Sequence, residues 1–123
     1  MTVLQTITGE VQKGQSRGKK LGFPTINFPM TEKIEEGIYV SKIVIAEKAY
    51  NALTFIGSAK TFNETIVQAE TYVFDFDQDI YGRSVSVSLL KKLRDNKKFD
   101  SEELLVKQME TDKKQAEDFF KTF

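Results

Sequence analysis

The amino-acid sequence predicts a mainly β fold in which an antiparallel barrel is closed on one side by a C-terminal α-helix. Three observations lead to this prediction. About six short segments are rich in β-branched or aromatic residues, and polar connections separate them. No long helical crossover lies between these segments, which argues against a parallel α/β sheet. The end of the chain changes to the apolar spacing of an amphipathic helix.

The expected strands follow one another at 2–11, 25–28, 37–45, 50–56, 66–76 and 83–90. Glu47-Lys48 is expected as the tight turn after the third strand, and 77–79 as the turn after the fifth. The sixth strand has the clearest pattern, since Val85, Val87 and Leu89 alternate with serines. Such alternation is typical of a strand that is buried on one face.

A helix is expected over about 101–120, with Asp100 and Glu103 spaced as a capping box at its start. Its apolar stripe consists of residues three or four positions apart, namely Leu105, Met109, Asp112, Ala116 and Phe119. Asp112 is the charged member of this stripe, and a carboxylate in such a place should be paired or hydrogen-bonded. We interpret it as structural support that orients an arginine or a loop amide.

Length and composition predict one domain over 1–123, with a barrel at about 3–90, a loop at 91–100 and a helix at about 101–120. The formal net charge is zero, so no whole-domain basic surface for nucleic acid is expected. No window approaches roughly 18 apolar residues, and no basic-then-apolar leader is seen. Neither a membrane span nor a signal peptide is therefore predicted, which favours the cytoplasm by default.

The sequence contains no Cys and no His. Their absence excludes disulfides, Cys or His metal ligands, and nucleophile pairs of the Ser-His or Cys-His kind. Acid–base chemistry is left to Asp, Glu, Lys or Tyr. A metal ion, if one is bound, would be a hard cation held by oxygen atoms.

The stretch 18–28 combines residue types that build sites: two glycines, two lysines, a proline and a Thr-x-Asn pair. Thr25 and Asn27 are two residues apart, so in an extended segment their side chains point the same way. A hydroxyl and an amide carbonyl side by side are oxygen ligands of the kind that Mg²⁺ accepts. A plain loop that leads into a strand is the alternative interpretation.

The loop 14–20 is basic and contains glycine, yet it does not match a Walker A sequence. It has three residues between its glycines, and no Lys-Ser or Lys-Thr pair follows them. Glycine amides together with lysine and arginine can still wrap a polyphosphate. A solvated, charged hairpin is the other possibility. The basic excess is local: residues 12–20 hold Lys13, Arg17, Lys19 and Lys20 and no acid, which fits a small anion better than a polymer.

Glu70 lies in the fifth expected strand, in a file with Tyr72, Phe74 and Phe76. If this carboxylate is partly desolvated, it becomes a usable general base. The opposite face of the strand is apolar too, so the pattern leaves open which face is inside and whether Glu70 is a structural carboxylate. The loop 93–99 offers cations and one aromatic ring, which suits either a lid or a solvated charge run.

These pieces, taken in order, resemble the ATP-dependent riboflavin kinase domain in its bacterial form. The resemblance runs from about Thr8 to Phe120 and rests on 14–18, 21–27, 37–39, 55–57 with Thr61-Phe62, Glu70, 80–82, Leu93-Arg94, 98–101 and Asp112. It implies a six-stranded antiparallel, Greek-key β-barrel with a C-terminal helix. It also implies that the γ-phosphate of ATP passes to the 5′-hydroxyl of riboflavin, giving FMN and ADP, with Mg²⁺ as cofactor.

The resemblance assigns four roles to residues of this sequence. Glu70 would accept the proton of the attacking hydroxyl, and Thr25 and Asn27 would hold Mg²⁺. The nucleotide would be bound by Gly14, Arg17, Gly18, Lys19, Lys20, Pro24, Thr25 and Asn27. A flap at 91–100 would cover the flavin with Arg94, Lys97 and Phe99. The protein is expected to be a monomer that binds riboflavin or FMN and ATP or ADP, and neither nucleic acid nor a membrane.

Two positions depart from the family pattern, since Lys60 stands where proline is usual and Tyr72 where many members have histidine. Most bacterial members carry an FMN adenylyltransferase domain before the kinase, so this chain is either a stand-alone kinase or the kinase part of a longer protein. FAD synthesis by it is not expected. Two other functions compete: a flavin- or nucleotide-binding barrel that regulates without turnover, and a small barrel that binds single-stranded nucleic acid.

Overall fold

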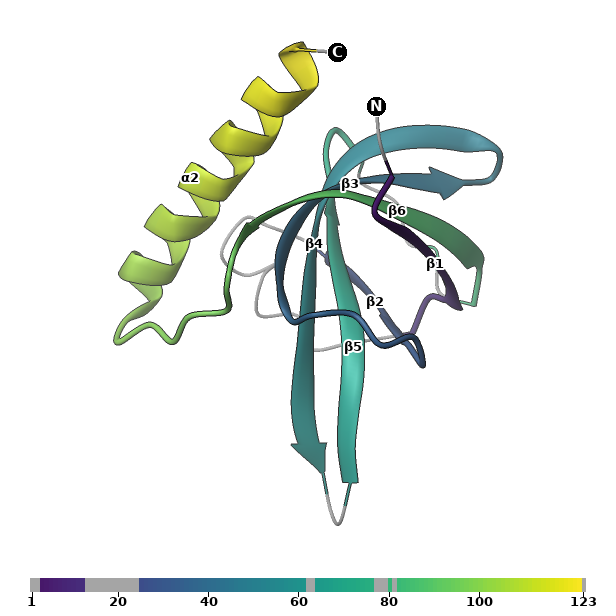
Figure 1. Cartoon of the computed structure of the whole chain (residues 1–123), viewed down its shortest axis with the longest axis horizontal. Coiled ribbons are helices and arrows are strands. Elements are labelled where there is room, and N and C mark those ends of the chain that lie inside the picture. Colours follow the sequence, from purple (N-terminus) through teal and green to yellow (C-terminus); the bar gives the residue numbers. More distant parts are fainter. Residues whose placement is uncertain (1–2, 13–24, 62–63, 77–79, 81, 123) are drawn as a thin grey trace.

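The structure, a computed structural model, describes residues 3–12, 25–61, 64–76, 80 and 82–122, with the backbone alone at 59–61 and 64–66 (Figure 1). The elements are β1 Gln5–Glu10, β2 Thr25–Pro29, β3 Gly37–Ile45, β4 Lys48–Thr61, β5 Glu64–Val73, β6 Ser84–Arg94 and α2 Glu102–Lys121. The predicted strands and the C-terminal helix are therefore all present, in the predicted order.

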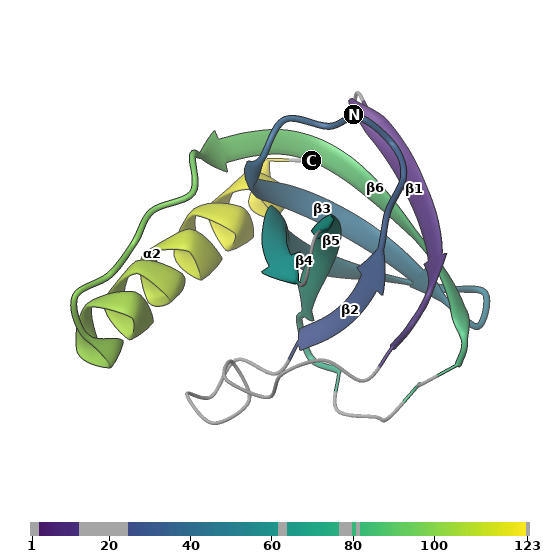
Figure 2. The same cartoon turned by 90° about the horizontal axis from the view of Figure 1, so that it is seen from below.

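The strands form one six-stranded antiparallel sheet in the order β1-β6-β3-β4-β5-β2. β3, β4 and β5 pair consecutively and β6 returns to pair with β3, which is a Greek-key arrangement. The sheet curls into a half-barrel (Figure 2). Near its two edges, the backbone N–H of Gln12 donates to the carbonyl of Asn27 at 2.7 Å. The predicted fold class is confirmed.

The main core lies inside the curled sheet, and each strand contributes alternate residues to it. Phe28 on β2 is fully buried there, and its ring lies against Gly9 of β1, where a Cβ atom would collide with it. On β5, Ala69 and Val73 face this core. Glu70 therefore lies on the outer face of the sheet, which settles the question that the sequence pattern left open.

Three buried hydroxyl side chains cross the core from strand to strand. Ser41 on β3, Thr54 on β4 and Thr71 on β5 are each 0% exposed. The hydroxyl oxygens of Ser41 and Thr54 are 2.8 Å apart, and those of Thr54 and Thr71 are 3.0 Å apart. Because each hydroxyl has a partner, the penalty of roughly 1–3 kcal/mol for an unsatisfied buried group is avoided. These bonds connect the central strands directly behind the outer face that carries Glu70.

Helix α2 covers the outer face of β3, β4 and β5 (Figures 1 and 2). Its apolar side packs on a second cluster, whose buried members are Ile38, Val40, Leu53, Tyr72, Phe74, Met109 and Ala116. The N-cap of the helix is Ser101, whose hydroxyl accepts from the Leu104 N–H at 3.2 Å. The predicted capping box placed the N-cap at Asp100, which is wrong by one residue. Ser101 is the N-cap, because its backbone is extended and its hydroxyl accepts from the helix.

The connection between β6 and α2 is shorter than predicted. β6 continues to Arg94, because residues 91–94 keep pairing with β3 across two register shifts. The flap expected at 91–100 is thus confined to 95–101, and its first expected residues belong to the sheet. The predicted alternation within β6 is confirmed, since Val85, Val87 and Leu89 are buried.

The β3–β4 and β5 boundaries also differ from the predictions. Ala46 and Glu47 have positive φ angles of 50° and 69° and form the two-residue connection of the β3–β4 hairpin. The turn therefore lies one residue earlier than Glu47-Lys48, and β4 begins at Lys48. β5 ends at Val73 rather than at residue 76, because a turn follows in which Asp75 has a φ of 57°.

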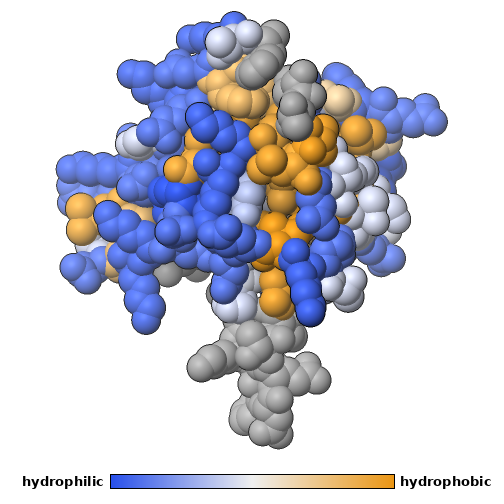
Figure 3. Space-filling view, in the orientation of Figure 1, coloured by the Kyte–Doolittle hydropathy of each residue, from blue (hydrophilic) through white to orange (hydrophobic). Residues whose placement is uncertain are grey.

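The surface in the view of Figure 3 is mainly hydrophilic, with an apolar band near its centre. Among the described residues, the large apolar side chains that are exposed are Val3, Leu4, Val44 and Leu104. Leu104 lies on α2, beside the pocket described below. Within the same described part of the chain, no helix combines the length and the apolarity needed to cross a membrane.

The start of β3 depends on a glycine. Gly37 has a φ of 152°, and a Cβ atom there would lie 2.5 Å from Cε of Lys92 and 2.7 Å from the carbonyl oxygen of Arg94. We expect Gly37→Ala to lower the free energy of unfolding by about 1–3 kcal/mol, since it combines backbone strain with a clash against β6. Gly57→Ala is the matched control, because its Cβ would be 3.6 Å from the nearest atom. Equal denaturant midpoints for the two variants would contradict this expectation.

Candidate functional site

The pairing of β2 with β5 brings three predicted site residues together. Thr25 is paired with Tyr72 and Asn27 with Glu70, and residues paired across antiparallel strands share a face. The hydroxyl of Thr25 donates to Oε1 of Glu70 at 2.6 Å. Two residues that are 45 positions apart in the sequence are thus in direct contact on the outer face of the sheet.

Local sequence explains why these side chains point outward. Along β2, Ile26 and Phe28 point into the main core, so Thr25 and Asn27 take the opposite face. Asn27 is only 8% exposed, and Glu70 is half-buried. The apolar residues of β2 therefore fix the direction of its polar residues.

The atoms on this face suit a hard cation and an acid–base step. A threonine hydroxyl has one hydrogen and two lone pairs, and here the hydrogen is directed at Glu70, which leaves the lone pairs for another ligand. Within the described residues no cluster of three or more acidic, His or Cys side chains could hold a metal. Mg²⁺ does not require such a cluster, because it keeps several waters and commonly uses one or two protein oxygens beside substrate phosphates. The hydroxyl, amide and carboxylate oxygens present here fit this ion.

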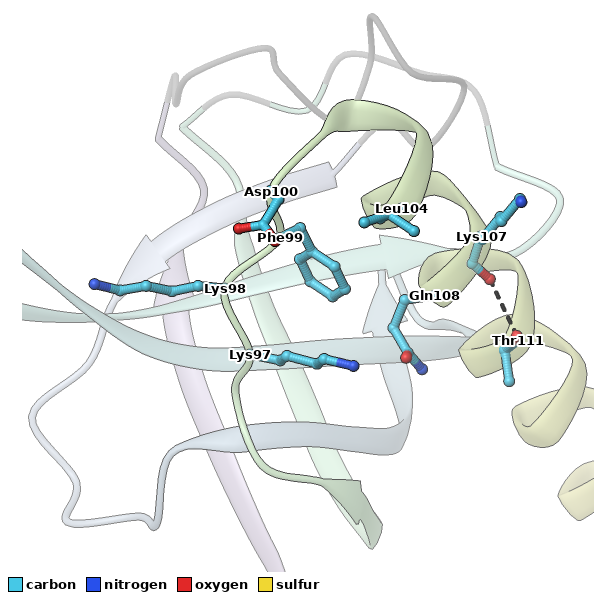
Figure 4. Close-up of a pocket in the computed structure, with 8 residues that line it drawn as sticks. All are labelled: Lys97, Lys98, Phe99, Asp100, Leu104, Lys107, Gln108 and Thr111. Atoms are coloured by element: carbon cyan, nitrogen blue, oxygen red, sulfur yellow. Dashed lines mark hydrogen bonds between the residues drawn. The ribbon is translucent and has the colours of Figure 1, made fainter.

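A pocket of about 400 Å³ lies between the β6–α2 connection and the first turns of α2 (Figure 4). Its lining residues are Lys97, Lys98, Phe99, Asp100, Leu104, Lys107, Gln108 and Thr111. In Figure 4, Lys97 and Gln108 point toward each other beside the ring of Phe99, while Lys98 extends away from the helix. The pocket therefore offers an aromatic surface, an apolar contact at Leu104 and several polar groups.

Arg94 and Asp112 form a bidentate ion pair next to this pocket. Nε of Arg94 donates to Oδ1 of Asp112 at 2.9 Å, and Nη2 donates to Oδ2 at 2.7 Å. The Asp112 side chain is 0% exposed, so the charge is paired where an unpaired one would be costly. The prediction that Asp112 orients an arginine is confirmed. Arg94 itself is not among the residues that line the pocket.

A second ionic group fixes the start of the connection. Nζ of Lys92 lies 2.5 Å from Glu35 and 2.6 Å from Asp95. The hydrogen bonds that Lys92 donates to Asp95 and Glu35 raise its pKa above the usual range, and the same ammonium lowers the pKa of Asp95. Burial raises the pKa of Tyr39, whose hydroxyl donates to the Glu35 carbonyl at 2.6 Å. Asn96, which follows Asp95, donates from its side-chain amide to the Ile56 carbonyl at 3.0 Å.

Some of the remaining predicted site residues lie in the described part of the chain and others do not. Gly14, Arg17, Gly18, Lys19, Lys20 and Pro24 lie outside the described residues, as does the side chain of Lys60. Lys97 and Phe99 line the pocket. Tyr72, the departure from the family pattern, is next to Thr25 on the outer face, and the ammonium of Lys113 lies 5.7 Å from the centroid of its ring.

Sequence reasoning missed the contribution of α2 to the pocket. Leu104, Lys107, Gln108 and Thr111 come from the helix and were not predicted as site residues. A signal was present, because Gln108 precedes Asp112 by one helical turn and therefore lies on the same side of the helix. The sequence alone does not say which loop that side meets.

The fold and the site define a β-barrel domain that places a hydroxyl–carboxylate pair and a pocket of ligand size on one side of its sheet. The family model described as "Flavokinase: Riboflavin kinase" matches residues 3–120. This chain belongs to the riboflavin kinase family.

Named relatives agree with this family. The chain is 41% identical over 117 residues to the trifunctional protein RibF/MnmA of Mycoplasmoides gallisepticum, covering 93% of this chain and 18% of that protein. It is 32% identical over 120 residues to the bifunctional riboflavin kinase/FMN adenylyltransferase of Bacillus subtilis, covering 93% of this chain and 38% of that protein. The chain thus spans less than half the length of these two relatives.

A solved structure supports the fold. The crystal structure of riboflavin kinase from Trypanosoma brucei superimposes with a TM-score of 0.66 at 20% identity, covering 94% of this chain and 79% of that chain. At this level of identity the likeness bears on the architecture alone. It agrees with the curled six-stranded sheet and the C-terminal helix found here.

The Lys92–Asp95 pair can be tested by titration. We expect Asp95 to titrate below its ordinary pKa of 3.8, because it accepts a hydrogen bond from Lys92 at 2.6 Å. Its contribution to stability is then present at neutral pH and is lost as the pH falls through the lowered folded-state pKa. NMR titration of side-chain carboxyls measures this value directly.

The controls for this titration are two lysine variants. Lys92→Met should return the pKa of Asp95 to its ordinary range, whereas Lys91→Met, at an exposed neighbouring position, should leave it lowered. An Asp95 pKa at or above 3.8 in the unsubstituted protein would show that the pair does not form in solution.

Proposed function

We propose that this chain transfers the γ-phosphate of ATP to the 5′-hydroxyl of riboflavin, giving FMN and ADP. The observation that carries the proposal is the Thr25–Glu70 hydrogen bond of 2.6 Å on the face shared by β2 and β5. Phosphoryl transfer depends mainly on positioning and charge neutralisation, so a carboxylate base beside oxygen ligands for a hard cation is a sufficient set of groups. Membership of the riboflavin kinase family supports the choice of substrate.

Glu70 is the proposed general base. Its Oε1 accepts from Thr25, which restricts the orientation of the carboxylate, and Oε2 is a second acceptor on the same group. Oε2 would take the proton of the ribityl hydroxyl while the hydroxyl oxygen bonds to the γ-phosphorus. The bond from that phosphorus to the β–γ bridging oxygen breaks, and its electron pair leaves with ADP. A base of this kind contributes about 10²–10⁴-fold.

Thr25 and Asn27 would hold Mg²⁺ together with the phosphate oxygens of ATP. The lone pairs of the Thr25 hydroxyl are available because its hydrogen is directed at Glu70. When bound, Mg²⁺ would neutralise charge on the phosphates. The rest of the nucleotide site is proposed from the sequence resemblance at Gly14, Arg17, Gly18, Lys19, Lys20 and Pro24.

The flavin ring would occupy the pocket between the β6–α2 connection and α2. Its volume of about 400 Å³ lies within the usual range for small-ligand sites. Phe99 supplies a face for a planar ring, and Gln108 and Lys97 supply polar contacts for its edge. Phe55 lies between the proposed base and the helix, since it is the cross-strand neighbour of Glu70 and also packs against the cluster under α2.

The setting of the reaction is part of the same proposal. We infer a monomeric enzyme in the cytoplasm, because both halves of the proposed site come from one chain and ATP is plentiful there. ATP is a co-substrate in this scheme, and riboflavin and FMN are the flavin ligands.

Replacement of Glu70 tests the proposed base. We expect Glu70→Gln to bind riboflavin and ATP normally but to lower kcat for FMN formation by at least about tenfold, because glutamine cannot take up the proton. Chromatography with fluorescence detection measures FMN. Glu117→Gln, at an exposed position on α2, is the control and should retain full activity.

Two results would contradict this proposal. An unchanged kcat for Glu70→Gln would remove Glu70 from the role of base. Intact riboflavin binding by the unsubstituted protein, without FMN under any divalent cation, would favour a regulatory flavin-binding barrel instead.

A further inference from the structure

Asp112 is a buried carboxylate with an unusually complete set of partners. It accepts two hydrogen bonds from Arg94, at 2.9 and 2.7 Å, and a third from Nε2 of Gln108 at 3.0 Å. Its side chain is 0% exposed. Charge-assisted bonds of this kind are strong and directional, so Asp112 fixes the orientation of both partners.

Both partners of Asp112 are in contact with the pocket, one directly and one through a lining residue. Gln108 lines the pocket itself. Arg94 reaches it through Phe99, because its guanidinium lies 5.9 Å from the centroid of that ring. The ammonium of Lys97 lies 5.8 Å from the same centroid, so the ring has a cation from each of two residues. One buried carboxylate is thus connected to two walls of the pocket.

The geometry of Arg94 also limits what else it can do. Nε and Nη2 donate to Asp112, and Nη1 donates to the Asp95 carbonyl at 3.1 Å. The Arg94 side chain is only 19% exposed. A guanidinium held at three of its nitrogens in this way is better suited to support Phe99 than to move onto a ligand.

An ion pair that only stabilises the fold can be told apart from one that orients neighbouring side chains by replacing both of its members. Replacing both members of a buried ion pair with apolar residues of similar volume is often neutral or stabilising, whereas removing one member is strongly destabilising. A role in orientation needs the planar fork of arginine and the two oxygens of the carboxylate. These two roles therefore separate when the pair is replaced as a whole.

We propose that Asp112, acting through Arg94 and Gln108, is a positioning residue that sets the shape of the flavin pocket and so its affinity for the flavin ring. This inference rests on the proposed function for the identity of the ligand. It differs from the role that the family resemblance gives to Arg94, because Arg94 here acts through Phe99 instead of contacting the flavin.

The test compares riboflavin binding with stability in two variants. Arg94→Lys keeps the charge and loses the fork, and the double variant Arg94→Met with Asp112→Leu removes the buried charges together. We expect both to bind riboflavin about tenfold more weakly by fluorescence titration in the absence of ATP. The double variant should retain the melting temperature of the unsubstituted protein. KM for ATP should change by less than about twofold in both, since the β2–β5 face is untouched.

Asp118→Asn is the matched control, because it removes an exposed ion pair with Lys121 from the same helix. It should leave riboflavin affinity unchanged. Unchanged riboflavin affinity in the folded double variant would overturn the proposal and reduce the network to a structural one. An equal rise in KM for ATP and for riboflavin would overturn it as well.

Failure of the kinase proposal can be distinguished from failure of the proposal for Asp112. If the unsubstituted protein binds riboflavin but forms no FMN, the kinase proposal fails while the binding comparison still decides the role of Asp112. If the unsubstituted protein does not bind riboflavin, both proposals are overturned.

Discussion

The antiparallel register between β2 and β5 is the constraint on which the rest of the candidate site depends. It places Asn27 beside Glu70, and the hydroxyl of Thr25 donates to that same carboxylate at 2.6 Å. Burial on the opposite face sets this register, because Ile26 and Phe28 occupy the main core. A slip of one residue would expose the Phe28 ring, at roughly 1.5–3 kcal/mol for the side chain, and would turn the polar pair inward. Hydrophobic packing inside the barrel thus fixes the polar geometry outside it.

The Greek-key connection brings the end of β6 to the same side of the sheet as helix α2. Because β6 returns beside β3, its end at Arg94 comes under α2 and meets Asp112 there. β4 lies between β3 and β5, and its Phe55 is opposite Glu70 and packs against the cluster beneath the helix. Phe55 therefore connects the neighbourhood of the proposed base to helix α2, and this helix supplies one wall of the proposed flavin pocket.

Sequence patterns predicted much of this and failed where long-range packing decides. The spacing of Thr25 and Asn27 was enough to place them on one face. The direction of Glu70 could not be predicted, because both faces of β5 carry apolar residues: Ala69 and Val73 face the main core, and Tyr72 packs under α2. The end of β6 at Arg94 was missed because backbone pairing with β3 continues under polar side chains. Gln108 was missed because its role depends on which loop the helix meets.

The central claim is that the nucleotide and the flavin bind at separate sites that meet at Glu70. Chemical-shift mapping by NMR tests this claim most directly. Mg²⁺ with ADP should shift the backbone amides of 25–29 and 69–71, and riboflavin should shift those of 97–111. The amide of Glu70 should respond to both ligands when they are added together. Shifts from both ligands confined to one of these regions, or riboflavin shifts on β2 with none on α2, would contradict the account.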